Sequence, residues 1–538
     1  MITRAQDVTS LPFQVCIVGA GPVGLATAFR LEKQGIGVLL VEAGQHDNGG
    51  RVVNATNHHH APPASSMASG LGGTSSLWGG RCVGFDDIDF IERPHVPNSG
   101  WPIPHHAVSR YYDDAFDFLN VEGPRPVVTS NPLLLGEVHA DSMEWWSSKP
   151  ELANIYREKI EGSQLIHFLP DTSATSIELD ASGAASHLHL EGVQGRLRVP
   201  VAKLVLAAGG VGNARLLHQL NRAYPGRLSR TLGAYYQGHL TGYIAMIEFH
   251  DDAVVDTLSF KTTPKGSVFR RRLQLSDDVQ HRLGLLNCVF WLDTVSISNA
   301  LHHSAGFSAL FLILQLTGLY RFLANGKAAG SFLRRDVRYR DHLRNLVPSL
   351  RALNDLRDTV RQLCRRNRKA PLVNPARRYL LRYHAEQAPD PASAVTPSPS
   401  KGEHHLAAVT IDYRVREEDL DSIERSHVFL DQWLRKNELG RLDYLHAEEE
   451  RRQALRDQAY DGFHQIGLTR MAASPENGVV DSDCKVYNAD NLYVAGSCVF
   501  STGGHANPTM PAVALAMRLA DHLAETIRTV HSIEWAKS

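Results

Sequence analysis

The chain has 538 residues, of which 43% are hydrophobic and 21% are charged, and its formal net charge at pH 7 is −1. This length predicts two or three lobes rather than one hydrophobic core, and the near-zero charge gives no indication of nucleic-acid binding. The six cysteines form no CxxC pair, which argues against a zinc or other metal site and a redox dithiol. No apolar run reaches the about 18 residues of a transmembrane helix, and no secretion signal is recognised, so we expect a cytoplasmic protein without a transmembrane segment.

Residues 13–44 have the pattern of a strand, a glycine turn, a helix and a second strand. Val15–Val18 and Val38–Val41 are continuous apolar runs, as in a parallel sheet that is covered on both faces. Residues 25–33 between them have helical character, and Gly35 is typical of a helix end. The segment therefore predicts a nucleotide-binding unit.

The turn of this unit reads Gly19-Ala20-Gly21-Pro22-Val23-Gly24, which fits GxGxxG. In this motif Gly19 permits the tight turn, Gly21 lets the backbone approach a pyrophosphate, and Gly24 lets the helix pack on the strand. The N-terminus of the helix offers N–H groups and a positive dipole end to the phosphates. Glu42 ends the next strand and can accept hydrogen bonds from a ribose. The motif predicts a dinucleotide site without choosing between NAD and FAD.

Buried strands followed by helices recur twice later in the chain, before and after a middle part with a different pattern. Buried strands are predicted at 202–210 and 491–497, and each is followed by a helix. Between them, strand patterns at about 240–300 and 378–413 flank a helical insertion at about 304–370. A last strand that returns to the first domain would bring C-terminal residues to a cofactor held by the N-terminal part.

The helical insertion is apolar at its start and increasingly rich in arginine toward its end. We interpret it as a core helix followed by solvated helices. The alternatives are a lid over the cofactor, a membrane-surface contact by residues 305–370, and arginines that meet a phosphate-bearing substrate.

Several motifs besides the glycine turn carry a family resemblance. They are "GLGGTSSLWGG" (70–80), "GWPIPHHAVSRYYDDA" (100–115), "VLAAGGVGNARLL" (205–217), "GFHQIGLTRM" (462–471) and "GGHANPTMPAV" (503–513). In this order and spacing they resemble the glucose–methanol–choline (GMC) flavin oxidoreductase family, and the "FWLD" (290–293) and "YHAEQ" (383–387) regions resemble its bacterial sugar- and aminosugar-oxidising branch. The resemblance implies an α/β fold, with a Rossmann-like FAD-binding domain and a second α+β substrate-binding domain of antiparallel sheet plus helices.

The same resemblance implies how the chain is divided. Residues 1–225 would form the first part of the FAD-binding domain, and residues 226–455 the substrate-binding domain with its insertion. Residues 456–538 would return to the FAD-binding domain and carry the catalytic residues.

Carried over residue by residue, the resemblance implies FAD contacts in several segments. The loop that ends at Trp78 would run along the pyrophosphate and the flavin ring, and Ala174 would lie where relatives hold adenine. Some relatives have a histidine just before this tryptophan that bonds covalently to the flavin, so Leu77 predicts non-covalent FAD. The expected FAD-binding residues are Gly19, Gly21, Gly24, Glu42, Gly73, Thr74, Ser75, Trp78, Ala174, Ala208, Gly209, Gly496, Ser497, Pro508 and Thr509.

Two residues near the C-terminus match the catalytic positions of the family. His464 matches the first position, where an imidazole can take a proton near neutral pH. Asn507 matches the second position, which is His or Asn in different branches; an amide cannot take the proton but can hold the substrate oxygen. His505 is the nearest rival, and we interpret it as a loop histidine that hydrogen-bonds to backbone.

The middle domain is expected to select the substrate. "YHAEQ" (383–387) resembles a strand of the family's substrate sheet, and alternation places His384 and Glu386 on one face. If that face points inward, His384, Glu386 and His505 are candidate substrate contacts. If it points outward, the two strand residues are solvated.

The expected reaction is FAD-dependent oxidation of a CH–OH group to a carbonyl, with the hydride passing to flavin N5 and the proton to His464. The substrate would be a sugar, glycoside, aminosugar or related hydroxylated small molecule, and the electron acceptor O2 or another acceptor. The alternatives are an alcohol or sterol oxidase of the same family and a flavin monooxygenase. The sequence leaves the regiochemistry and the oligomeric state open.

Overall fold

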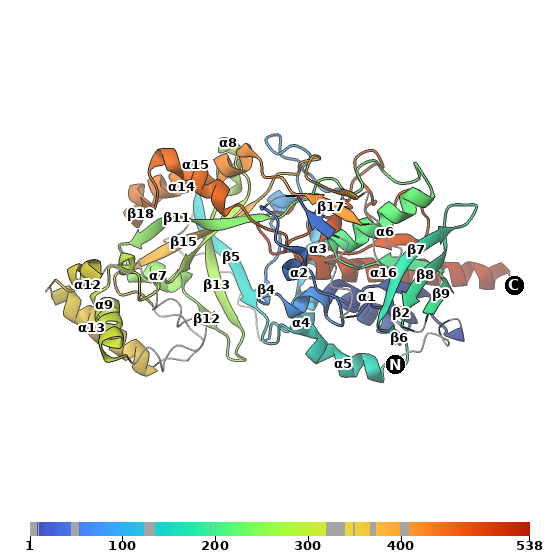
Figure 1. Cartoon of the computed structure of the whole chain (residues 1–538), viewed down its shortest axis with the longest axis horizontal. Coiled ribbons are helices and arrows are strands. Elements are labelled where there is room, and N and C mark those ends of the chain that lie inside the picture. The colour runs from blue at the N-terminus through green and yellow to red at the C-terminus, as the bar shows by residue number, and fades with distance from the viewer. Residues whose placement is uncertain are drawn as a thin grey trace.

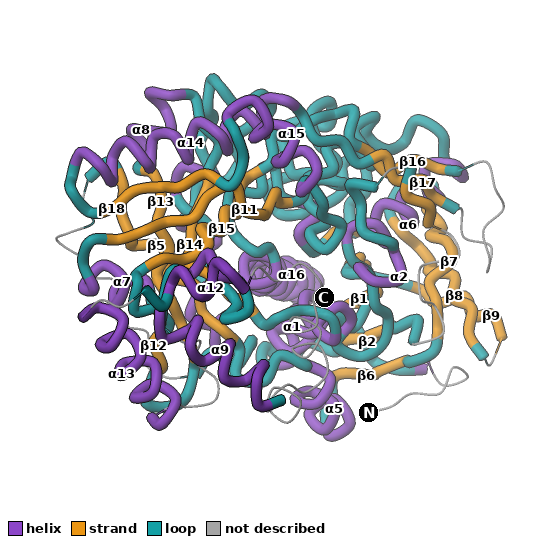
Figure 2. Tube along the Cα trace, turned by 60° about the vertical axis from the view of Figure 1, so that its left-hand side comes forward, coloured by secondary structure: helices purple, strands orange, loops and turns teal. Residues whose placement is uncertain are grey.

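The structure is a computed structural model of the chain. It describes residues 8, 10–44, 53–56, 58–122, 134, 136–193, 195–318, 339–347, 350–365, 373–398 and 408–537. Two lobes lie side by side along the longest axis (Figure 1). The lobe that holds both termini contains a parallel sheet, and the other contains a large antiparallel sheet (Figure 2).

The parallel sheet has five strands in the order β19-β10-β1-β2-β6. Its central strands β1 and β2 are fully buried, as their continuous apolar sequences require. The last strand of the chain pairs in parallel with β10, which brings the C-terminal segment beside the N-terminal one. The bounds are β1 (Val15–Val18), β2 (Val38–Val41), β6 (Ile166–Leu169), β10 (Lys203–Leu206) and β19 (Leu492–Val494). The predicted Rossmann-like core is therefore confirmed.

Helices from both ends of the chain pack on this sheet and on each other. The first helix, α1 (Pro22–Glu32), lies against the last helix, α16 (Thr509–Lys537), in the right-hand lobe (Figure 1). Arg30 of α1 donates from Nε to Asp521 Oδ1 of α16 at 2.8 Å. The other helices of this lobe are α2 (Pro63–Ser66), α3 (His106–Ser109), α4 (Tyr112–Phe118), α5 (Leu152–Gly162) and α6 (Gly210–Ala223).

Two smaller sheets complete this lobe. One is a hairpin extension and the other joins the segment after β2 to a segment from the middle of the chain. Their strands are β7 (Thr172–Leu179), β8 (Ala185–Gly192) and β9 (Gly195–Pro200), and β3 (Val53–Ala55), β16 (Ala394–Pro397) and β17 (Val409–Asp412). Short 3-10 helices lie at Gly73–Ser76, Asp87–Asp89, Ala300–His302 and Ser497–Val499.

The second lobe is built on an eight-stranded sheet in the order β18-β11-β15-β14-β13-β5-β4, with β12 paired to β13. One face of this sheet carries apolar side chains that form a second hydrophobic core with the helix α14 (Glu417–Lys436). The strands are β4 (Arg81–Cys82), β5 (Val138–Trp146), β11 (His239–Phe249), β12 (Lys261–Thr262), β13 (Val268–Leu275), β14 (Cys288–Asp293), β15 (Arg378–Glu386) and β18 (Gly440–Tyr444). The shorter helices are α7 (Asp252–Leu258), α8 (Asp277–Leu283) and α15 (Glu448–Gln458). The predicted α+β class of the second lobe is therefore confirmed.

The strands do not follow the predicted division of the chain in every place. β4 and β5 lie within residues 1–225 but pair in the antiparallel sheet of the second lobe. Conversely, β16 and β17 lie within residues 226–455, and Val395 and Ile411 belong to the core of the first lobe. Alternation within short strands indicates burial but not which sheet a strand joins, because the partner strand can come from any part of the chain.

The insertion forms a helical group at the outer end of the second lobe, away from α1 and α16 (Figure 1). Its described helices are α9 (Ala305–Thr317), α12 (Tyr339–Asn345) and α13 (Leu350–Arg365). α9 buries Phe307 and Phe311, as expected of a core helix. This position does not fit a lid over a site beside α1 and α16. Arginines of residues 319–338 lie outside the described residues, and the membrane-surface contact stays a prediction.

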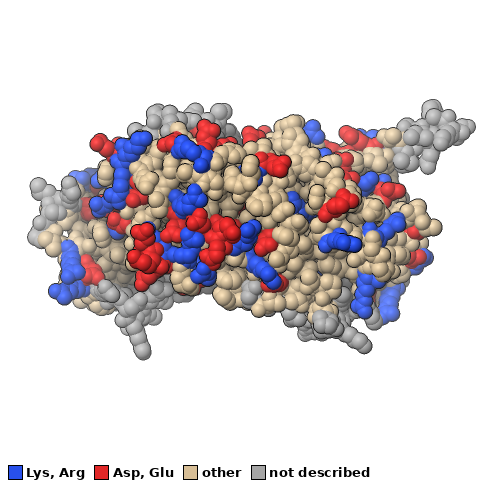
Figure 3. All heavy atoms as spheres, turned by 90° about the horizontal axis from the view of Figure 1, so that it is seen from above, with Lys and Arg blue, Asp and Glu red and all other residues tan. Residues whose placement is uncertain are grey.

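The described surface carries both signs of charge. Lysine and arginine alternate with aspartate and glutamate on the face seen in Figure 3, in keeping with the formal net charge of −1. Arg452, for example, donates to Asp421 and Glu424 at 3.0 and 2.8 Å. None of the described helices is long and apolar enough to cross a membrane.

Acid should weaken the second core through His427. Burial lowers the pKa of His427 to about 4, and its ring packs against Phe290. Below an unfolded-state pKa of about 6.5, the unfolded chain binds a proton at this histidine that the folded chain does not bind. The free energy of unfolding therefore decreases as the pH falls from about 6.5 toward 4. We expect His427→Leu to reduce the pH slope of the unfolding free energy between pH 7 and 5 by about 1 kcal/mol per pH unit.

Urea unfolding at several pH values measures this slope. The exposed His250, changed to leucine, serves as the matched control and should leave the slope unchanged. Equal slopes for His427→Leu and the unchanged protein would contradict the prediction.

Candidate active site

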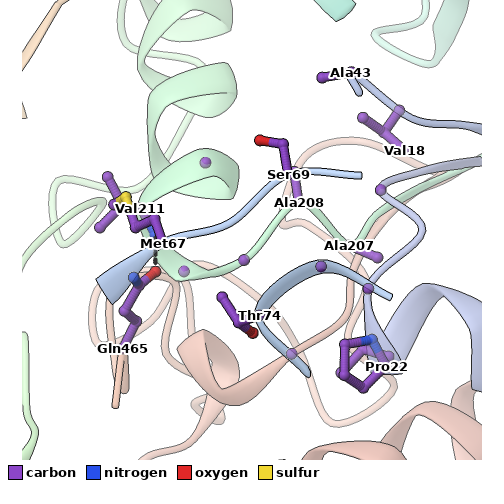
Figure 4. Close-up of a pocket in the computed structure, with 18 of the residues that line it drawn as sticks. Val18, Pro22, Ala43, Met67, Ser69, Thr74, Ala207, Ala208, Val211 and Gln465 are labelled. Atoms are coloured by element: carbon purple, nitrogen blue, oxygen red, sulfur yellow. Dashed lines mark hydrogen bonds between the residues drawn. The ribbon is translucent and has the colours of Figure 1, made fainter. Parts of the chain in front are cut away.

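An elongated pocket lies in the first lobe, at the carboxyl ends of β1, β2 and β10. Side chains and turns from many parts of the chain surround it, and Gln465 Oε1 accepts a hydrogen bond from Val211 N at 2.9 Å across one wall (Figure 4). Of the fifteen expected FAD-binding residues, twelve line this pocket: Gly19, Gly21, Glu42, Gly73, Thr74, Ala174, Ala208, Gly209, Gly496, Ser497, Pro508 and Thr509. A site at the carboxyl ends of parallel strands is where dinucleotides bind in this class of fold.

The glycine turn shapes the pocket floor in the way the motif predicts. Gly19 has φ +108°, and a Cβ there would lie 2.4 Å from Ala207 O, so only glycine fits. A Cβ on Gly24 would lie 1.9 Å from Gly19 O, whereas one on Gly21 would meet only Gly73 Cα at 4.0 Å. Gly21 is thus free of steric demands within the protein, and its missing side chain leaves room for a ligand.

Helix N-termini also face the pocket. α1 begins just after Gly21 with no side-chain cap and no acidic residue in its first turn. α16 begins at Thr509, which lines the pocket together with Pro508. Uncapped N–H groups and the positive ends of helix dipoles favour phosphate and other anionic groups.

Glu42 stands at the end of β2, where a ribose is expected. Its Oε2 accepts a hydrogen bond from Ala20 N at 2.8 Å, and its Oε1 accepts from Gly44 N and Gly70 N at 3.1 and 2.8 Å. The carboxylate therefore joins three turns around the pocket. Together with Ala174 on β7 it marks the end that the resemblance assigns to adenosine.

Three expected FAD-binding residues do not line the pocket. Gly24 acts by letting α1 approach the turn. Ser75 Oγ donates to Gly72 O at 2.7 Å and accepts from Leu152 N at 3.3 Å, which stabilises its loop. Trp78 Nε1 donates to Pro150 O at 2.7 Å. Their direct contact with FAD stays a prediction, and the structure places them as supports of the loop.

Changing Gly21 and Gly24 should separate cofactor binding from folding. We expect Gly21→Val to leave a folded protein that binds little FAD, because the added side chain projects into the pocket without striking the backbone. Gly24→Val should lower the melting temperature as well, because its Cβ overlaps Gly19 O. Flavin absorbance per protein and thermal melting by circular dichroism measure the two effects. Full FAD content in Gly21→Val would contradict the assignment.

His464 and Asn507 do not line the pocket themselves, but in the chain they stand directly beside the lining residues Phe463, Gln465 and Pro508. Asn507 Nδ2 is 3.3 Å from His464 Nε2. The Oδ1 atom of Asn507 is buried, and no described residue donates a hydrogen bond to it. The structure thus brings together the two residues that the resemblance pairs, with hydrogen-bonding capacity left for a ligand.

Two residues that the sequence interpretation missed hold His464 in place. Asp461 Oδ2 lies 3.0 Å from His464 Nδ1, and His239 Nδ1 lies 3.0 Å from the same atom. Burial alone would raise the pKa of the Asp461 carboxyl, but His464 and His239 hold it well below its usual range. Burial, followed by the charge of His464, lowers the pKa of His239 to about 3, so His239 is neutral.

These contacts determine which ring nitrogen of His464 carries the proton. His239 Nε2 lies 3.0 Å from Gly504 O, which can only accept, so Nε2 of His239 bears the proton and its Nδ1 is an acceptor. His464 must then donate from Nδ1, toward Asp461 and His239. In the neutral ring this leaves the lone pair on Nε2, the atom that faces Asn507.

His505 occupies a different environment, fully buried in the loop before Asn507. Its Nε2 lies 2.8 Å from Asp86 Oδ2, and Arg272 Nη2 lies 3.1 Å from its Nδ1. A guanidinium can only donate, so His505 accepts at Nδ1 and donates to Asp86 from Nε2. Both ring nitrogens are thus engaged, by side chains rather than by the backbone groups expected from the sequence, and its contact with substrate stays a prediction.

The face of β15 that carries His384 and Glu386 points inward. His384 Nδ1 donates to His505 O at 3.0 Å, and its ring lies 5.9 Å from that of His464. Glu386 is fully buried, and Arg93 donates to its carboxylate from Nη1 at 2.7 Å and from Nη2 at 2.5 Å. His384 is therefore beside the candidate catalytic pair, whereas Glu386 is engaged in an ion pair.

His239, His384 and His464 also form the one group of described residues whose arrangement could hold a metal ion, with ligand atoms within 4.8 Å of one another. The hydrogen bonds described above already use both nitrogens of His239, Nδ1 of His464 and Nδ1 of His384. A metal would have to displace several of these bonds. The expectation of no metal remains a prediction.

The sequence contained a weak signal for Asp461 and none for His239. Asp461 stands three residues before His464, and its Oδ1 accepts from the backbone N–H groups of residues 462, 463 and 464 at 2.7, 2.8 and 3.2 Å. Aspartate often accepts hydrogen bonds from the backbone N–H groups that follow it, so a sequence can indicate this local turn. His239 is a single histidine in a strand, and only the fold brings it to His464.

Comparisons with known proteins agree with this architecture. Residues 389–516 match the family model described as GMC oxidoreductase, and residues 17–67 match one described as an NAD(P)-binding Rossmann-like domain. Pyridoxine 4-oxidase from Mesorbium loti aligns over 95% of this chain and 99% of its own at a TM-score of 0.50 and 16% identity. A fungal aryl-alcohol oxidase aligns over 98% of this chain and 100% of its own, at a TM-score of 0.51 and 13% identity.

Curated relatives match only in part. A C-glycoside 3-oxidase of Microbacterium trichothecenolyticum is 42% identical over 66 residues, which is 12% of this chain and 13% of that protein. A C-glycoside 3-oxidase of Arthrobacter globiformis is 33% identical over 125 residues, 23% and 22% of the two chains. A 2-methyl-1,2-propanediol dehydrogenase of Mycolicibacterium austroafricanum is 35% identical over 63 residues, 12% and 11%. The matched segments thus span less than a quarter of each relative.

The family match covers the C-terminal segment that holds His464 and Asn507, and the fold match covers both lobes. The glycine-lined pocket fits a dinucleotide such as FAD, because three glycines of the turn and loop, Gly19, Gly21 and Gly73, let backbone groups approach the ligand closely. The chain therefore joins a C-terminal segment similar to the GMC oxidoreductase family to a pocket of dinucleotide type.

Proposed function

We propose that this chain is an FAD-dependent oxidoreductase that converts a CH–OH group to a carbonyl. The observation that carries this proposal is the Nε2 atom of His464, which has a lone pair and faces Asn507 at the end of the dinucleotide pocket. FAD bound in that pocket would supply the hydride acceptor, flavin N5. The protein supplies the base, the orientation of the substrate and the surroundings of both.

His464 would take the hydroxyl proton at Nε2 while the carbon loses its hydride. The loss of one proton and one hydride from CH–OH gives the carbonyl, so no further reactant is needed in this half of the reaction. The positive charge that forms on the ring would lie 3.0 Å from the Asp461 carboxylate, which stabilises it. His239 stays neutral and continues to accept from Nδ1, which keeps the ring orientation unchanged.

Asn507 would position the substrate oxygen rather than react. Its amide is adjacent to the His464 lone pair, and an amide neither gains nor loses a proton at neutral pH. A substrate hydroxyl between the two side chains would be aligned for proton transfer. The α16 N-terminus at Thr509 lies beside this end of the pocket, where it favours negative charge on a reduced cofactor.

The substrate proposed is a sugar, glycoside or related polyol. Two of the curated relatives with matching segments are C-glycoside 3-oxidases, and the third acts on a diol. We propose O2 or another small acceptor as the partner that reoxidises the cofactor. Non-covalent attachment of FAD is also proposed, since the pocket lining includes no histidine, cysteine or tyrosine among the described residues.

The test is anaerobic mixing of the purified yellow protein with a panel of sugars, glycosides and simple alcohols. Bleaching of the flavin absorbance by an alcohol in the absence of NAD(P)H supports the proposal. Reduction by NAD(P)H alone would instead indicate a monooxygenase and overturn it. Repeating the reaction in air with peroxide detection identifies O2 as acceptor, and acid precipitation that releases the flavin into solution tests non-covalent attachment.

A further inference from the structure

We infer that the sheet face next to His464 and Asn507 binds an anionic group of the substrate, a carboxylate or a phosphate, through the guanidinium of Arg272. This inference rests on the proposed function and narrows its substrate to hydroxylated molecules that carry such a group. The site lies on strands β13, β14 and β5 of the second lobe.

Contacts between side chains connect Arg272 to the candidate catalytic residues. Arg272 Nη2 donates to His505 Nδ1 at 3.1 Å, and His505 O accepts from His384 at 3.0 Å. The ring of His384 lies 5.9 Å from that of His464, and His505 is two residues from Asn507 in the chain. Arg272 therefore contacts the loop that presents Asn507, through the side chain of His505.

The charges around Arg272 do not balance within the sheet. Arg270 donates from Nε to Glu144 Oε2 at 2.7 Å, and Arg81 Nη1 lies 3.7 Å from Glu144 Oε1, so two cations share one buried carboxylate. Asp293 lies 3.8 Å from Arg270, but it also pairs with Arg382 at 3.1 Å. Among the described residues, no carboxylate lies within ion-pair distance of Arg272.

The nearest carboxylate beyond this set is Asp86, on the other side of His505. His505, Asn287 and Gln274 all donate hydrogen bonds to Asp86 Oδ2. Its charge is thus already compensated by three donors. Asp86 holds His505 in place and does not form an ion pair with Arg272.

Donors of Arg272 remain for a ligand. Its side chain is fully buried, Nη2 donates to Ser142 Oγ at 2.7 Å, and no described residue accepts from Nε or Nη1. Trp291 Nε1, also buried, has no acceptor among the described residues either. The Trp291 ring lies 5.9 Å from that of His384, and the His384 ring lies 5.9 Å from that of the candidate base His464.

A buried cation without a partner is costly, and the surroundings of Arg272 reflect this cost. Burial lowers the pKa of Arg272 to about 10, so the guanidinium still carries its charge at neutral pH. The hydrogen of Nε and the Nη1 group lie on opposite sides of the Nε–Cζ bond, so each nitrogen has a hydrogen that could be donated to one oxygen of a carboxylate or phosphate. Such a group at either donor would supply the missing charge together with an acceptor, whereas a neutral hydroxyl would supply an acceptor alone.

The rim of this region is partly exposed. The side chain of Arg81 is 32% exposed and that of His464 is 19% exposed, on either side of Trp291 and Arg272. Arg81 also lies over the Trp291 ring, at 5.2 Å from its centroid. A second cation near the rim would attract an anionic substrate and orient it with its charged end toward β13.

The test compares D-glucuronate, D-glucose 6-phosphate and D-glucose with the FAD-loaded protein. Two measurements are made, the anaerobic rate of flavin bleaching and the shift in melting temperature caused by each compound. We expect kcat/KM for one of the anionic compounds to exceed that for glucose by about tenfold or more, as hydrogen bonds to a charged group imply. The preferred anion identifies the group as carboxylate or phosphate.

Arg272→Met should lower the ratio of anionic to neutral kcat/KM by at least about tenfold, mainly through KM, and should abolish the melting shift with the anion. Because the ratio is the readout, a general loss of activity from disturbing the His505 loop does not affect the conclusion. Arg272→Lys keeps the charge and should retain part of the preference. Arg271→Met, the next residue on the same strand, is the matched control, since Arg271 Nη1 donates to Ala140 O instead.

The outcomes separate the two proposals. If alcohols fail to bleach the flavin but an anionic compound still raises the melting temperature through Arg272, the binding inference holds and the proposed oxidation fails. If glucose is preferred to both anions, or if Arg272→Met and Arg271→Met change the ratio equally, the inference is overturned while the oxidation stands.

Discussion

Replacing His464 by alanine is expected to slow flavin reduction by substrate about 10²- to 10⁴-fold while FAD remains bound. The expected loss is large because Nε2 of His464 is the nitrogen whose hydrogen bonds leave a lone pair toward Asn507. His239 Nδ1 is occupied by His464, and the amide of Asn507 cannot accept a proton from substrate. Rapid mixing under anaerobic conditions measures the rate of reduction separately from reoxidation.

His505→Ala provides the comparison within the same loop. His505 has both ring nitrogens engaged, by Arg272 and Asp86, so its loss should disturb substrate positioning more than proton transfer. The His505 variant should therefore reduce its flavin faster than the His464 variant. Reduction of the His464 variant at the unchanged rate would contradict the assignment of the base.

Asp461→Asn should also cause a large loss, of about 10²- to 10³-fold in the rate of reduction. Oδ1 of Asp461 accepts three backbone N–H groups and Oδ2 accepts the backbone N–H of His239, so the amide nitrogen of an asparagine would replace a needed acceptor at either place, and the negative charge beside His464 Nδ1 would be lost. His464 would then lose the carboxylate that stabilises the positive charge on its ring as it takes the proton. The protein should still bind FAD.

A double variant tests whether Asp461 acts through His464. If it does, His464→Ala with Asp461→Asn should be no slower than His464→Ala alone, because the residue that Asp461 positions is already absent. Losses that multiply would indicate an independent role for Asp461, for example in holding the 461–464 turn. Melting temperatures of all three variants show how much stability each change removes.

The nucleotide-binding end of the molecule was predictable because its signals are local. Gly19, Gly21 and Gly24 occupy the turn, and each has the steric environment that the GxGxxG pattern requires. Apolar runs in β1 and β2 indicated buried parallel strands without knowledge of their neighbours. His464 and Asn507 were placed by resemblance, and the structure brings them to within hydrogen-bond distance.

Strand partners and the surroundings of His464 were not predictable in the same way. The place of β5 in the second lobe follows from its pairing with β13, more than a hundred residues away. The sequence of a strand does not identify the strand with which it forms hydrogen bonds, so register and partner are decided when the lobes assemble.

By itself the sequence determined the glycine turn and the buried strands, and it offered candidate residues for acid–base chemistry, because backbone freedom and the kind of ionisable group are properties of single residues and short segments. Only the tertiary structure decided which nitrogen of His464 holds the lone pair, through His239 and Gly504 from distant segments. The tertiary structure alone also buried Arg272 where no described residue accepts a hydrogen bond from its Nε or Nη1. Both are differences in electrostatic environment, and such environments depend on groups that meet only in the folded chain.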